Sequence, residues 1–140
     1  MLEGFSIKSY QTRELIRESF KNILDKSLPE GTIIHSDQGT LYNNLMFQNE
    51  LKDRNFIQSM SRKGTPIDNS PMESFFSCYK SVVLYNPNIS IVSKVDFIRE
   101  TWKYYDYYNN VRIQKKLGYL IPAVFKKNEL VRISKKKSDK

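Results

Sequence analysis

The feature that most constrains the fold is an alternation of amphipathic helical stretches with two short β-branched segments. Strands are predicted at residues 32–35 and 56–60, and turn-forming residues follow each of them. Apolar residues at helical spacing predict helices over about residues 12–28, 42–54, 71–80 and 93–110. This order predicts an α/β domain with helices packed on a sheet. Because sheets average about five or six strands, the sheet is expected to be incomplete.

Composition indicates a soluble globular chain. Of the 140 residues, 39% are apolar and 27% are charged. No apolar run approaches the roughly eighteen residues that a membrane span requires, so no membrane partner is expected. The N-terminus has no basic stretch followed by an apolar one, which argues against a secretory signal. The single cysteine, Cys78, fits a reducing compartment, and a cytoplasmic location is expected.

Charge is distributed unevenly along the chain. Residues 1–70 carry nine Lys/Arg and nine Asp/Glu, whereas residues 71–140 carry fourteen against six, which accounts for the net charge of +8. A basic half joined to a neutral half predicts a polyanionic partner, and nucleic acid is the first candidate. A solvated basic surface that maintains solubility is the alternative that charge alone leaves open.

Two carboxylates stand at positions suited to metal chemistry. Asp37 follows a buried-looking strand, and Glu73 lies in the first turn of a predicted helix, with thirty-five residues separating the two. A strand-end carboxylate and a helix carboxylate can converge on Mg²⁺, which prefers oxygen ligands and keeps positions open for substrate phosphates. The pairing alone is weak evidence, because Asp37 is equally a turn residue and Glu73 a favourable charge at a helix N-terminus.

Longer motifs add context to these two residues. The chain resembles the integrase-core transposases of the IS-three family of bacterial insertion sequences, and the similarity spans about residues 3–127. The motifs, in order and at the family's spacing, are residues 35–39 (His-Ser-Asp-Gln-Gly), 59–64 (Ser-Met-Ser-Arg-Lys-Gly), 68–76 (Asp-Asn-Ser-Pro-Met-Glu-Ser-Phe-Phe), 79–80 (Tyr-Lys) and the terminal signature at residues 107–125.

The resemblance implies an RNase H-like fold, in which helices flank a mixed sheet of five strands. It also implies an Asp, Asp, Glu triad that holds two Mg²⁺ or Mn²⁺ ions, with Asp37 as the second Asp and Glu73 as the Glu. The implied reaction is metal-dependent attack on DNA phosphodiesters, by water in cleavage and by a 3′-hydroxyl in strand transfer, at the ends of an insertion sequence.

The chain also departs from the family pattern. No residue matches the first Asp, and Val82 stands where the family often carries a further acid. The chain is therefore expected to be an N-terminally truncated C-terminal part that lacks the first strands and is inactive alone, so whether it is itself an enzyme stays open. The alternatives are a non-catalytic DNA-binding fragment and a degenerate remnant that never folds stably. A homo-oligomer is expected for the complete protein, with an upstream-encoded polypeptide as a further possible partner.

Basic residues supply the candidate contacts to the DNA backbone. Two groups are predicted, one flanking the carboxylates and one in a basic run beside aromatic residues. They are Arg62, Lys63 and Lys80 in the first group, and Arg112, Lys115 and Lys116 in the second. The alternative for Tyr107 and Tyr108 is packing of the last helix onto the core. His35 is expected to orient the turn at Asp37 rather than to touch substrate.

Two regions are predicted along the chain. Residues 1–125 are expected to form a partial integrase-type core with a C-terminal helical extension. Residues 126–140 hold seven Lys/Arg and two acids, which predicts a basic, flexible tail.

Overall fold

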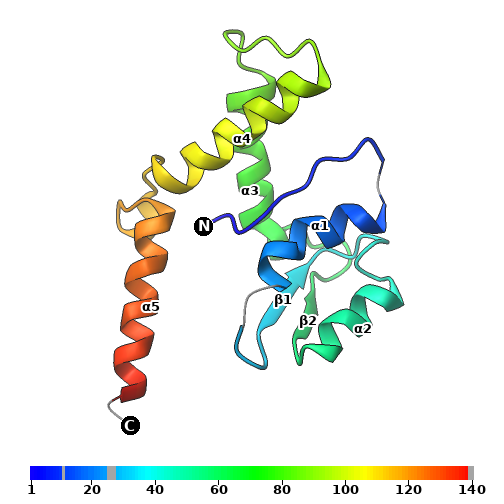
Figure 1. Ribbon diagram of the computed structural model, residues 1–140, viewed down its shortest axis with the longest axis vertical. Helices are drawn as coiled ribbons and strands as arrows, with labels where there is room; N and C mark the ends of the chain where they lie inside the picture. Colours follow the sequence, from blue (N-terminus) through cyan, green and yellow to red (C-terminus); the bar gives the residue numbers. More distant parts are fainter. Residues whose placement is uncertain (11, 25–27, 139–140) are drawn as a thin grey trace. The chain divides into compact units, whose positions relative to one another are not determined.

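The computed structural model describes residues 1–10, 12–24 and 28–138 of the chain (Figure 1). It divides into two compact units, which we call the strand unit (residues 3–78) and the helical unit (residues 1–2 and 79–140). The predicted boundary at residue 125 falls inside a helix of the second unit, α5 (Pro122–Ser138). Whether residues 126–140 move independently stays a prediction.

The strand unit is built on two parallel strands joined through a helix. Strand β1 (Ile33–Ser36) pairs with β2 (Ile57–Met60), and Ile33 lies opposite Ile57 in the register. Parallel neighbours need a crossover connection, which is supplied here by α2 (Leu45–Asp53). The predicted α/β class is therefore confirmed, and the described residues contain a sheet of two strands.

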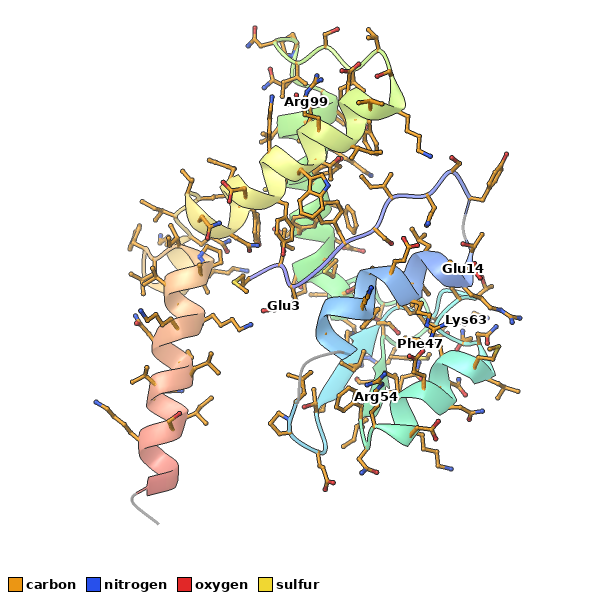
Figure 2. All side chains as sticks on the ribbon, viewed as in Figure 1. Glu3, Glu14, Phe47, Arg54, Lys63 and Arg99 are labelled. Carbon is orange, nitrogen blue, oxygen red and sulfur yellow. The ribbon has the colours of Figure 1, made fainter. Side chains whose placement is uncertain are left out.

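One face of this sheet carries the core of the unit. Ile34 of β1, Ile16 of α1 (Arg13–Leu24) and Phe47 and Leu51 of α2 form a buried cluster. Phe47, labelled in Figure 2, packs edge-on against Phe20, with the ring centroids 5.5 Å apart. Alternation along the strands leaves Ile33 and Ile57 on the opposite face, where they are 64% and 52% exposed. The sheet is thus covered on one face within its own unit.

Short turns lead from β2 into the next helix. The expected loop after β2 contains a 3₁₀ turn, η1 (Pro66–Asn69), which runs directly into α3 (Ser70–Tyr79). In the helical unit, a π-helical turn, η2 (Lys80–Leu84), follows α3. Tyr79, the last residue of α3, and Val83, in η2, are both buried. They are four residues apart, so the π turn keeps both side chains buried.

The helical unit is organised around α4 (Lys94–Asn110). Ser93 caps this helix, because its hydroxyl accepts a hydrogen bond from the Asp96 N–H at 3.1 Å. Near its other end, buried Asn109 holds the backbone of Leu2. The Leu2 N–H donates to Asn109 Oδ1 at 2.8 Å, and Asn109 Nδ2 donates to the Leu2 carbonyl at 3.0 Å. A 3₁₀ turn, η3 (Lys115–Leu117), then leads to α5.

Candidate functional site

Asp37 lies immediately after the carboxyl end of β1, where its side chain is exposed. The Gly39 N–H donates to Asp37 Oδ1 at 2.9 Å, which closes a short side-chain-to-backbone turn. The turn continues with the Tyr42 N–H donating to the Gly39 carbonyl at 2.9 Å. One carboxylate oxygen of Asp37 is therefore held by the chain's own backbone.

Tyr42 forms the apolar side of this turn. Its ring packs against Phe47, with centroids 5.7 Å apart, and is partly buried against the core. Burial raises the pKa of the Tyr42 hydroxyl, and the negative charge of Asp37 raises it further. Asp37 thus lies at the boundary between the core of the strand unit and solvent.

Hydrogen bonds join the carboxyl ends of the two strands. The Ser61 N–H donates to the Ser36 carbonyl at 2.9 Å, and Gln38 Nε2 donates to the Ser61 carbonyl at 3.0 Å. His35 Nδ1 lies 2.9 Å from Ser59 Oγ, and His35 Nε2 lies 3.2 Å from Ser61 Oγ. The histidine thus contacts β2 and the residue after it, rather than the Asp37 turn that it was expected to orient.

An ion pair holds the loop between β2 and α3. Arg62 donates to Asp68 from its backbone N–H, from Nε and from Nη2, each at 3.0 Å. The Arg62 side chain lowers the pKa of Asp68 to about 2, mainly by hydrogen bonding. Gly64, at φ +74°, allows the tight turn between the partners, in which the Thr65 N–H donates to the Arg62 carbonyl. The end of β2 and the start of η1 are therefore held together.

Glu73 lies in the first turn of α3 and is exposed. It follows the Arg62–Asp68 pair by five residues, and the Ser36–Ser61 bond ties that pair to the strand end that bears Asp37. The structure thus places both predicted carboxylates in the strand unit, on segments linked by these contacts. Across residues 1–10, 12–24 and 28–138, no group of three or more His, Cys, Asp or Glu residues is arranged to hold a metal ion.

The predicted DNA-binding residues fall in both units. Arg62 and Lys63 are exposed in the strand unit, and a phosphate at Arg62 would share its guanidinium with Asp68. In the helical unit, Lys115 and Lys116 are exposed in η3, and Lys80 is exposed in η2. The remaining candidate, Arg112, lies over the Tyr108 ring at 5.6 Å from its centroid.

The net positive charge of the chain lies in the residues after α4, a shorter stretch than residues 71–140. Residues 1–110, up to the end of α4, carry thirteen Lys/Arg and thirteen Asp/Glu. Residues 111–138, which contain η3 and α5, carry nine against one. On α4 the charges pair locally, because Arg99 contacts Asp96 at 2.8 Å and Lys103 contacts Glu100 at 2.9 Å. We call residues 111–138 the basic segment.

Two residues of the site were not singled out from the sequence. Gly39 holds Asp37 through a backbone N–H, and the motif at residues 35–39 was the available signal for it. Asp68 is the second, and its carboxylate binds Arg62. No sequence signal identifies that pair, because it depends on how the loop closes.

No helix among the described residues is both long and apolar enough to cross a membrane. No family model matches the chain, and no solved structure matches it.

Several curated relatives are transposases of insertion sequences. The chain is 34% identical over 126 residues to the transposase for insertion sequence element IS904 of Lactococcus lactis, a match that covers 89% of this chain and 49% of that protein. It is 38% identical over 112 residues to the putative transposase InsK for element IS150 of Escherichia coli, covering 76% and 38%. With the transposase InsF for IS3A of Escherichia coli, identity is 29% over 129 residues, covering 91% and 44%.

The chain spans about half the length of these relatives, or less. The matches extend over most of the chain itself, so the resemblance does not depend on one short motif. The predicted relationship is confirmed: this chain is a homologue of bacterial insertion-sequence transposases.

Proposed function

We propose that this chain forms part of an RNase H-like, integrase-type core that acts in DNA transposition by metal-dependent cleavage and strand transfer of DNA phosphodiesters. The observation that carries the proposal is the linkage of Asp37 to the helix of Glu73. The Ser36–Ser61 bond joins the two strand ends, and the Arg62–Asp68 pair joins β2 to the turn before α3. This linkage gives two distant carboxylates a common structural support.

Both carboxylates fit a hard divalent cation, because Mg²⁺ and Mn²⁺ favour carboxylate oxygens and retain positions for phosphate. Asp37 and Glu73 would hold the metal, and both side chains are exposed to incoming substrate. When bound, a pair of such ions activates the attacking oxygen and stabilises the leaving one. The chain's own part is to hold the Asp37 carboxylate against the Gly39 N–H and to offer Arg62 and Lys63 to the DNA backbone.

Metal binding by the 140-residue chain tests the carboxylates directly. We expect Mn²⁺ binding, followed by electron paramagnetic resonance, to be weakened by Asp37→Asn and by Glu73→Gln, since each removes an anionic ligand. Asp53→Asn is the matched control, because Asp53 is an exposed acid at the end of α2. Equal affinity in all four proteins would contradict the proposal.

Catalysis is tested in a joined protein. This chain would replace the matching 126-residue segment of the IS904 transposase, and nicking of DNA that carries element ends would be measured with Mg²⁺. We expect Asp37→Asn and Glu73→Gln to abolish nicking and Asp53→Asn to leave it intact. Nicking that survives both substitutions would refute the assignment of these carboxylates.

A second candidate function is non-catalytic DNA binding, which the concentration of positive charge in the basic segment favours. Lys and Arg that neutralise phosphates release counterions, so the affinity for DNA would fall steeply with salt. This binding would survive chelation of Mg²⁺, whereas binding through the carboxylates would not. DNA is the proposed partner in both cases, and assembly of the protein into a homo-oligomer stays a prediction.

A further inference from the structure

Gly39 occupies a position where its lack of a side chain is required for space rather than for conformation. Its φ lies outside the left-handed range, unlike those of Gly31, Gly64 and Gly118. An L-residue could therefore adopt this backbone without the strain that a positive φ imposes. The restriction at residue 39 has to come from its neighbours.

Those neighbours are Asp37 and Tyr42. A Cβ at residue 39 would lie 2.9 Å from Asp37 Oδ1 and 3.4 Å from Tyr42 Cδ2. The first distance is too short for a stable contact, so one of the two atoms must move. The Tyr42 ring is packed on Phe47 at the core, and the Tyr42 N–H is bonded to the Gly39 carbonyl. The exposed Asp37 side chain is the part that can yield.

The same glycine also holds that carboxylate in place. Its N–H donates to Asp37 Oδ1 at 2.9 Å, so the atom that a Cβ would displace is the one that the backbone fixes. We propose that Gly39 is a positioning residue for Asp37: its N–H fixes one carboxylate oxygen, and its missing Cβ leaves room for that oxygen. The consequence for metal binding rests on the proposed function, in which the carboxylate of Asp37 is a ligand.

A double-substitution cycle in the 140-residue chain tests this inference. Gly39→Ala is expected to lower Tm in the wild-type background, because the Cβ displaces the Asp37 carboxylate. In an Asp37→Ala background the clashing oxygen is gone, and the same substitution is expected to raise Tm, since alanine restricts the unfolded chain more than glycine does. Coupling of this kind is expected between residues in contact and not between distant, independent sites.

Gly31→Ala supplies the matched control. An added Cβ at residue 31 meets nothing within 4 Å, but the residue has φ +74°, so alanine there is strained without involving Asp37. Its effect on Tm is expected to be the same in both backgrounds. Equal effects of Gly39→Ala in both backgrounds would overturn the positioning role. Amide hydrogen exchange at residue 39 is a second measurement, and it is expected to accelerate in Asp37→Ala.

Mn²⁺ affinity separates the inference from the function on which it rests. Loss of a partner that orients a metal ligand typically weakens binding by about 10- to 100-fold, and we expect a loss in this range for Gly39→Ala. In the Asp37→Ala background, Gly39→Ala is expected to have no further effect on affinity. Suppose that Gly39→Ala lowers Tm in the wild-type background and raises it in the Asp37→Ala background, but the wild-type chain binds no Mn²⁺. The positioning role is then supported, and the proposed metal site is refuted.

Discussion

Two adjacent lysines in η3 give the sharpest test of DNA binding. Lys115 and Lys116 are exposed, and they lie within the basic segment beside the stacked Arg112–Tyr108 pair. Each phosphate contact contributes about −0.9 to the slope of log affinity against log salt concentration. Replacing both lysines with glutamine should therefore reduce the magnitude of that slope by about 1.8 if both contact phosphates.

The expected effect is large enough to measure. When salt rises from about 50 to about 200 mM, a slope difference of about 1.8 corresponds to an affinity ratio of about 12-fold. The wild-type chain should therefore lose about 12-fold more affinity than the Lys115→Gln/Lys116→Gln variant over this range. Fluorescence anisotropy of a short dye-labelled duplex, with a chelator present, measures both slopes under the same conditions.

The control is a variant with the same change in net charge elsewhere. Arg17→Gln/Lys21→Gln removes two exposed cations from α1 in the strand unit. We expect this variant to keep the wild-type slope, because these side chains lie outside the basic segment. Equal slopes for both double variants would show that only overall charge matters. A wild-type slope in the Lys115/Lys116 variant would refute the phosphate contacts.

Two further predictions concern the strand unit. Leu51→Ala should reduce the free energy of unfolding by about 2–5 kcal/mol, because Leu51 is 1% exposed in the core. The neighbouring Lys52 is exposed, so Lys52→Ala should change the free energy of unfolding by less than about 0.5 kcal/mol. Urea unfolding followed by circular dichroism distinguishes the two. For Asp68, whose pKa of about 2 lies below its unfolded value, the stabilisation should be complete above about pH 4 and lost as pH falls toward 2. The stability difference between wild type and Asp68→Asn, measured against pH, should therefore shrink in that window, and a pH-independent difference would contradict the ion pair.

Local patterns predicted the helices and strands of this chain well where a cap or a β-branched run marks an end. Ser93 illustrates this, since its hydroxyl caps the first turn of α4 at the residue where that helix was predicted to begin. Helix α2 begins at Leu45 rather than near Tyr42, because the Asn44 side chain accepts the Met46 N–H at 2.9 Å. Residues 42 and 43 instead donate their N–H groups to the Gly39 carbonyl, so they belong to the turn at Asp37 and the helix begins after them.

The site was predicted less completely than the elements that carry it. Asp37 and Glu73 could be selected because a strand end and a helix start are recognisable locally, and the family motifs reinforced both. The Arg62–Asp68 pair could not be selected, because its partners meet only after Gly64 reverses the chain. The steric role of Gly39 depends on where the Asp37 side chain points, which no periodicity in the sequence encodes.

Charge divides the chain in a way that suits two different ligands. The strand unit carries nine Lys/Arg against ten Asp/Glu, so a divalent cation approaching Asp37 and Glu73 meets no net positive charge from that unit. The basic segment, by contrast, has one acid, Glu129, which is paired with Arg132 at 2.8 Å. A polyanion would be attracted to this segment, and a metal ion would be repelled by it. Substitutions in the basic segment should therefore change DNA affinity without changing Mn²⁺ affinity. Asp37 and Glu73 variants should weaken Mn²⁺ binding and leave unchanged the DNA affinity that is measured with a chelator present.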